Sequence, residues 1–217
     1  MHKPHRIQQL ATAAVALLTV AIGTGCATPE PSAQDTAKLV DNYVTQSFMP
    51  GTGQDLARLQ QDQTQKDCTA TRAKPSEELA NIIKARERKN MVYPDDGKLM
   101  GDWKAGAKIF EDGFGYRIGS FMPSNPKVAR GGNCYACHQG DAKEVAFGNL
   151  GPSLFGYGKE HGRSDATIKY TYEKIYNARA YNACSAMPRL GHNGILSPKQ
   201  VADLTAYVLS ADSPLNQ

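Results

Sequence analysis

The chain of 217 residues lacks an apolar run long enough to cross a membrane. Its main uncharged stretch, residues 10–22, is shorter than the roughly 20 apolar residues of a transmembrane helix. The chain also has little excess charge, formally +4, and no Lys/Arg tract interleaved with aromatic residues. The sequence therefore indicates no nucleic-acid interface and no patch for an acidic membrane. The composition fits one or two small globular domains and excludes collagen and coiled-coil proteins.

The N-terminus has the features of a secretory signal peptide. Lys3 and Arg6 precede the uncharged run, and small residues follow it at 23–27. We predict that residues 1–27 are a signal peptide and that the mature protein is exported. Their removal takes away two basic and no acidic residues, so the formal net charge falls from +4 to +2.

Cys26 leaves two processing routes open. Thr24 and Gly25 before it are the small residues that bacterial lipoprotein processing requires, although Gly23 stands where leucine is usual. Lipidation of Cys26 would anchor the protein to a membrane. Cleavage after Ala27 would instead release it as a soluble periplasmic protein.

Residues 28–92 form a polar segment that predicts an N-terminal helical extension. Helical stretches are expected near residues 35–46 and 76–89, the second capped by Ser76. The first has one short apolar face, and the extension either packs on another surface or is a partly disordered linker. The members of that face are Leu39, Val40, Tyr43 and Val44.

Residues 93–217, predicted as one domain, contain the motif with the strongest chemical content. Cys134-Tyr135-Ala136-Cys137-His138 has the spacing at which two thiols add to the vinyl groups of a haem while the histidine reaches the iron. A disulfide pair or half a zinc site would need a redox fold or a second ligand pair, and the sequence suggests neither. We therefore predict one covalent haem c with His138 as an iron ligand.

The sequence Gly151-Pro152-Ser153-Leu154 follows His138 closely. A ligating histidine needs an acceptor for its second ring nitrogen, and the Pro152 carbonyl is a candidate. Leu154 and Phe155 would then wall the haem. The alternative is an ordinary surface turn with an apolar anchor.

The second axial position separates electron transfer from ligand chemistry. Met187 is the one methionine after His138, and Pro188 stiffens the chain that would deliver its sulfur. We predict Met187 as the iron ligand, with His161 and His192 as alternatives. Helices expected at residues 102–111 and 197–210 would cross through Gly106 and Tyr207 and close the haem crevice.

The two helices, the haem-binding sequence, the Gly-Pro turn and the Met-Pro segment follow one another along residues 101–210 as they do in class I cytochromes c. This resemblance implies an all-α fold. Residues 114–133 are a long insertion before the haem-binding sequence. Strings at 93–94, 97–103, 131–139 and 181–191 are similar to those of the SoxX family, the mono-haem subunits of SoxAX cytochromes.

That resemblance implies a place in periplasmic thiosulfate oxidation. SoxAX joins thiosulfate to a cysteine of the SoxYZ carrier, with the catalytic haem in a SoxA-like subunit. The X subunit accepts electrons, passes them to a small soluble cytochrome c and is not catalytic alone. A free-standing carrier, a cytochrome subunit of another oxidoreductase and a haem sensor remain alternatives.

Of five cysteines, Cys68 and Cys184 remain after the haem motif and Cys26 are set aside. An even remainder in an oxidising compartment favours a disulfide between them. A free Cys184, or a bond from Cys68 to a partner subunit, would be the other outcomes.

Overall fold

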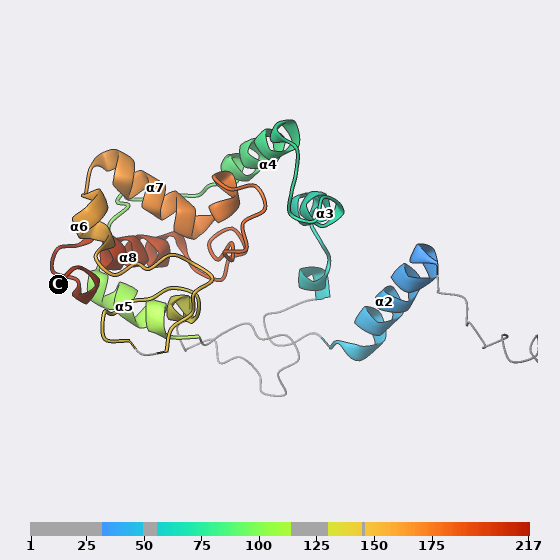
Figure 1. Ribbon diagram of the computed structural model, residues 1–217, viewed down its shortest axis with the longest axis horizontal. Coiled ribbons are helices and arrows are strands. Elements are labelled where there is room, and N and C mark those ends of the chain that lie inside the picture. Colours follow the sequence, from blue (N-terminus) through green and yellow to red (C-terminus); the bar gives the residue numbers. More distant parts are fainter. Residues whose placement is uncertain (1–31, 50–55, 114–129, 145) are drawn as a thin grey trace, which may run out of the picture. The chain divides into compact units, whose positions relative to one another are not determined.

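The computed structural model describes residues 32–49, 56–113, 130–144 and 146–217 (Figure 1). These residues form helices and no strand, so the prediction of an all-α fold is confirmed. The predicted signal peptide with Cys26, and residues 114–129 of the predicted insertion, lie outside the described residues. None of the helices described is both long and apolar enough to span a membrane.

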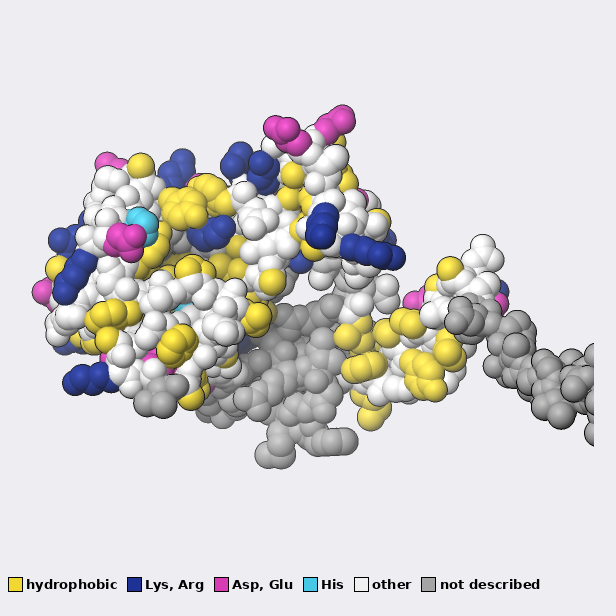
Figure 2. All heavy atoms as spheres, in the orientation of Figure 1, with side chains coloured by type: hydrophobic (Ala, Val, Ile, Leu, Met, Phe, Trp, Pro, Cys, Tyr) yellow, Lys and Arg dark blue, Asp and Glu magenta, His cyan; other side chains and the backbone are white. Residues whose placement is uncertain are grey.

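The chain divides into two compact units, Met1–Ser47 and Phe48–Gln217. The described helix of the first unit is α2, Ala33–Ser47, which confirms the helix expected near residues 35–46. None of its residues is buried, and hydrophobic side chains gather on one face of it (Figure 2).

The second unit contains the remaining helices. They are α3 (Gln63–Ala70), α4 (Glu77–Lys89), α5 (Trp103–Glu111), α6 (Tyr157–His161), α7 (Asp165–Tyr176) and α8 (Pro198–Leu209). Single 3₁₀ turns lie at Leu56–Leu59, Cys134–Ala136, Ala178–Ala180 and Pro214–Asn216.

Helices α5 and α8 pack against each other at the crossing predicted from the sequence. Asp102 caps α5, and Ser197 forms a capping box with Gln200 at the start of α8. Gly106 permits the close approach, because a Cβ there would lie 2.1 Å from the Asp203 carbonyl oxygen. The rings of Phe110 and Tyr207 meet edge to face beside this point, 5.2 Å apart.

Replacement of Gly106 by alanine should destabilise the protein by about 1 to 3 kcal/mol, because the new methyl group meets backbone atoms of α8 that cannot move aside cheaply. Helix propensity alone would act in the opposite direction, by about 1 kcal/mol. Chemical denaturation measures the difference, with the exposed Lys104→Ala in the same helix as control. Equal or greater stability of Gly106→Ala would show that the crossing is looser than described.

Helix α7 was not predicted, and it supplies much of the core. It begins at the cap residue Ser164, whose side chain accepts a hydrogen bond from the Thr167 amide. Tyr172 and Tyr176 are buried and pack with residues of α8 in one hydrophobic core. The Tyr172 hydroxyl also donates to the Val92 carbonyl, 2.8 Å away, which ties the segment after α4 to this core.

Part of the predicted extension packs tightly on the rest of the second unit. Ile83 and Glu87 of α4 are 0% and 2% exposed, and α4 contacts the 3₁₀ turn at Ala178–Ala180. Helix α4 is thus packed structure rather than linker. The two compact units meet between residues 47 and 48, whereas the sequence predicted a domain boundary between residues 92 and 93. That residues 93–217 fold independently of residues 28–92 stays a prediction.

Candidate haem site

The haem-binding sequence forms a compact turn. Asn133 precedes it in the left-handed conformation, and the His138 amide donates to the Cys134 carbonyl at 3.0 Å. Cys134 and Cys137 are both free thiols. Burial, with a smaller contribution from Cys137, raises the pKa of the Cys134 thiol to about 12.

His138 is held in one orientation and one tautomer. Its Nδ1 lies 2.7 Å from the Pro152 carbonyl oxygen, and because a carbonyl only accepts, Nδ1 carries the proton. The Nε2 lone pair is therefore available to a metal. Gly151 lets the backbone pass the imidazole, since a Cβ there would lie 2.2 Å from the His138 Cε1.

The segment that carries Pro152 is fixed to the haem-binding turn by backbone hydrogen bonds. The Gly151 amide donates to the Cys137 carbonyl at 2.8 Å, and the Leu154 amide donates to the Gln139 carbonyl at 2.9 Å. The backbone at Gly148 approaches the Ala136 carbonyl so closely that a Cβ there would lie 1.7 Å from its oxygen. This segment is part of the site rather than an independent surface turn.

Met187 lies with the apolar residues of the site. Its side chain is half-buried and packs against the same hydrophobic core as those of Cys134, Leu154 and Leu190. Gly132 lies between the two segments, because a Cβ on it would be 3.0 Å from the Cys134 Sγ and 3.3 Å from the Leu190 Cδ1. Leu190, three residues after Met187, and Cys134 of the haem-binding turn therefore both lie beside Gly132.

The alternative ligands lie in different surroundings. His161 is exposed at the end of α6, where the centroid of its ring lies 4.3 Å from that of Tyr157 with the two ring planes tilted. His192 is half-buried, and burial followed by the charge of Arg189 lowers its pKa. The choice of Met187 over these two remains a prediction.

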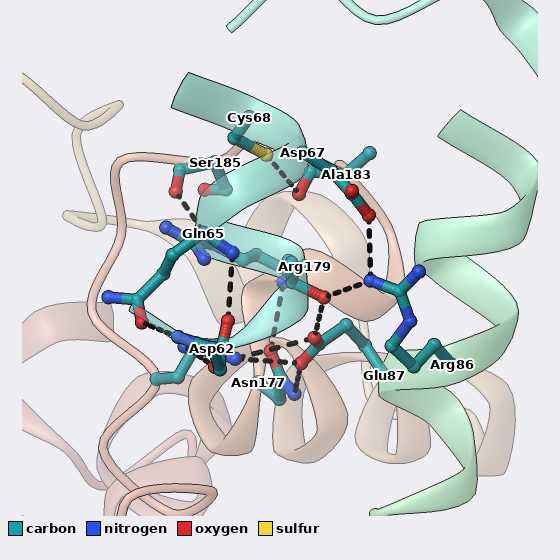
Figure 3. A network of polar contacts seen from close by, with 12 residues as sticks. Asp62, Gln65, Asp67, Cys68, Arg86, Glu87, Asn177, Arg179, Ala183 and Ser185 are labelled. Carbon is teal, nitrogen blue, oxygen red and sulfur yellow. Dashed lines mark hydrogen bonds and ion pairs between the residues drawn. The ribbon is translucent and has the colours of Figure 1, made fainter. Parts of the chain in front are cut away.

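A largely buried ionic cluster around Arg189, two residues after Met187, was not predicted. Arg189 donates to a Glu87 carboxylate oxygen at 3.2 Å and to an Asp62 carboxylate oxygen at 2.5 Å. Glu87 also accepts from the Asn177 amide at 2.6 Å and the Thr64 hydroxyl at 2.5 Å. Figure 3 shows the side chain of Glu87, from α4, and that of Asn177, from the end of α7, directed toward each other. Glu87 follows Ile83 by four residues, and this helical spacing, which places it on the buried face of α4, was the available signal.

Both acidic side chains of the cluster have lowered pKa values. Burial by itself would raise the pKa of Glu87, but the hydrogen bonds from Asn177 and Thr64 and the charge of Arg189 outweigh it and lower the pKa. Burial would also raise the pKa of Asp62, but the hydrogen bond from the Gln65 amide and the interaction with Arg189 outweigh it and lower the pKa. Both carboxylates are therefore ionised at neutral pH.

Glu87→Gln should unfold more easily than the wild-type protein at pH 7, by about 1 to 3 kcal/mol, because Arg189 loses its buried counter-charge. The native pKa of Glu87 lies below its ordinary value of 4.5, so its stabilisation is complete above that pH and is lost as the pH falls through the native value. Between pH 7 and pH 3, the thermal stability of Glu87→Gln should fall less than that of the wild-type protein. Parallel curves for the two proteins would contradict the ionised state of Glu87.

The other two cysteines among the described residues join α3 to the Met187 segment. Cys68 of α3 and Cys184 are joined as a disulfide, with Cα atoms 5.6 Å apart and a sequence separation of 116. This is the pairing that the cysteine count favoured. The bond attaches α3 to the chain three residues before Met187.

The residues present fit a covalently bound haem c. Two free thiols at the required spacing adjoin a histidine whose Nε2 is available, and a methionine thioether packs against the same core. Large apolar side chains are exposed along the segment around the turn, among them Leu150, which is 86% exposed. The others are Tyr135, Phe147 and Phe155. A flat apolar group at the turn would cover such side chains.

Comparison with known proteins points to the same site. A family model described as cytochrome c matches residues 103–212, which include the haem-binding turn and the Met187 segment. An uncharacterized lipoprotein of Aquifex aeolicus (strain VF5) is 37% identical over 165 residues, which cover 72% of this chain and 73% of that protein.

Proposed function

The chain belongs to the cytochrome c family of electron-transfer haem proteins, and from this premise we propose that it is the electron-accepting, mono-haem subunit of a SoxAX-type complex. Haem c attached at Cys134 and Cys137 supplies a one-electron couple at its iron. His138 and Met187 would occupy both axial positions and leave none for a substrate. The subunit would thus transfer electrons and would not be catalytic alone.

The reaction of the complex fixes how many electrons this subunit must carry. Thiosulfate and a SoxYZ cysteine thiol form a new sulfur–sulfur bond, the S–H bond breaks, one proton leaves and two electrons are released. A SoxA-like subunit would hold the reacting groups. A mono-haem subunit accepts one electron at a time, so each coupling requires two transfers through this chain to a small soluble cytochrome c.

The observation that carries the proposal is the position of the SoxX-like strings. Residues 131–139 form the haem-binding turn, and residues 181–191 hold Met187 between the disulfide and Arg189. Residues 97–103 pair with α8 through the Gly101 amide, which donates to the Ala202 carbonyl at 3.0 Å. The likeness to SoxX is thus concentrated in the segments that frame the haem site and in those that pack on them.

The proposed location is the periplasm. The Aquifex aeolicus relative is named a lipoprotein, which favours lipidation of Cys26 over cleavage after Ala27 in this chain. Release of the protein from the membrane fraction by Cys26→Ala would support the anchor.

The test is thiosulfate-dependent reduction of the haem in a reconstituted system. We expect co-purification with a co-expressed SoxA-like subunit and reduction of the haem when SoxYZ and thiosulfate are both added. A SoxYZ variant with its acceptor cysteine replaced by serine is the control, and it should give no reduction. If no complex forms and the haem is not reduced, the free-standing carrier or a subunit of another oxidoreductase takes the place of this proposal.

A further inference from the structure

The Met187 segment is tied to the N-terminal extension on both sides of the methionine. Three residues before it, Cys184 is bonded to Cys68 of α3. Two residues after it, Arg189 pairs with Glu87 of α4 and with Asp62, the cap of α3. Pro188 stands between Met187 and Arg189 and fixes one backbone dihedral of the short connection. The position of Arg189 therefore restricts where the Met187 sulfur can lie.

The ionic cluster resists displacement of this segment. The side chains of Arg189 and Glu87 are 5% and 3% exposed. Outward movement of residues 187–189 would separate the guanidinium from Glu87 and leave a buried charge without its partner, which is strongly unfavourable. Thr64 and Asn177 hold the Glu87 carboxylate from α3 and from the end of α7, so it cannot follow Arg189.

A need for stability alone does not explain this arrangement. Packed apolar side chains of similar volume often stabilise a protein as well as a buried ion pair does, whereas an ion pair with fixed hydrogen bonds permits one register of the segments that it joins. Glu87 receives hydrogen bonds from three separate segments, and Arg189 bridges two acidic side chains. The cluster thus specifies a single position for the chain next to Met187.

We propose that residues 62–89 hold the Met187 segment as a clamp through its Arg189, and that Glu87, Asp62 and Arg189 are positioning residues for the Met187 thioether. The inference rests on the proposed role of Met187 as the iron ligand and adds the part of the chain that holds it there. The clamp lowers the fraction of molecules in which Met187 has left the iron and another ligand can enter.

Imidazole binding to the oxidised holoprotein measures that fraction. An external ligand binds only when Met187 has left, so its apparent Kd equals the intrinsic Kd divided by the open fraction. We expect Glu87→Gln to lower the apparent Kd for imidazole about tenfold or more. Asp62→Asn, at a half-exposed position that tolerates substitution better, should lower it about threefold. The disulfide is the second connection to the Met187 segment, and the Cys68→Ala, Cys184→Ala double variant removes it. A reductant is not used for this purpose, because it would also reduce the haem iron.

Two controls separate positioning from general loss of stability. Asp203→Asn removes a buried carboxylate of α8 that bonds Lys199 and the Asp102 amide and is not part of the cluster. It should leave the imidazole Kd within about twofold of wild type even where it lowers the melting temperature. In a Met187→Ala background the sixth position is uncontested, so Glu87→Gln should change the Kd by less than about twofold.

The outcomes of the clamp test and of the ligand assignment are distinct. If the wild-type protein shows the sulfur-to-iron charge-transfer band and neither Glu87→Gln nor Asp62→Asn tightens imidazole binding, the clamp is overturned and Met187 remains the ligand. An equal effect of Glu87→Gln in the Met187→Ala background would also overturn it, because the effect would not act through Met187. Absence of the band in the wild-type protein would overturn both.

Discussion

Serine at both Cys134 and Cys137 should reduce covalent haem by at least about tenfold, to background in a haem stain of a denaturing gel. The two thiols form the bonds to the vinyl groups, and no other cysteine has the C-x-x-C-H spacing. Cys134 and Cys137 are free, and the remaining described cysteines are joined to each other. A single replacement should leave one attachment site and a lower yield of holoprotein.

The matched control is serine at Cys68 and Cys184. This pair lies outside the haem-binding turn, so the covalent haem per folded molecule should stay at the wild-type value. Intact-mass measurement of both double variants gives the attachment directly. Haem retained on the Cys134→Ser, Cys137→Ser protein after denaturation would show that attachment occurs elsewhere.

Loss of the disulfide should have the largest effect on stability. The bond closes a loop of 116 residues, and the Cys68→Ala, Cys184→Ala variant should unfold more easily by about 2 to 5 kcal/mol. The expected fall in melting temperature is on the order of 10 °C for a chain of this size. The bond restrains the unfolded chain and, in the native state, holds α3 against the segment before Met187.

Lys66→Ala, on the exposed face of α3, serves as the control for that measurement and should be nearly neutral. Alkylation before and after reduction, followed by mass analysis, tests the bond itself. The wild-type protein should take up the reagent at Cys68 and Cys184 only after reduction. Uptake at both without reductant would contradict the pairing.

The parts of the structure that the sequence predicted are those specified by nearby residues. α5 and α8 have strong caps and clear apolar stripes, and the haem-binding turn is a contiguous motif. The Pro152 carbonyl is only 14 residues from His138, so a Gly-Pro turn sufficed to suggest it.

The parts that were not predicted depend on distant partners. Arg189 and Glu87 are 102 residues apart, and no local pattern pairs them. α3 has the sequence QTQKDCTA, which lacks an apolar face, and it is held by a capping box at Asp62 and by the disulfide. α7 mixes tyrosines and threonines without a clear stripe, because it is covered on several sides by the core and by the end of the extension.

The near-infrared sulfur-to-iron charge-transfer band of the oxidised protein shows whether the Met187 thioether ligates the iron. The wild-type protein should show the band, and Met187→Ala should lose it while its haem remains covalently attached through Cys134 and Cys137. Persistence of the band in Met187→Ala would contradict the assignment of Met187. A wild-type protein that lacks the band and binds carbon monoxide when reduced would contradict electron transfer through a closed haem site.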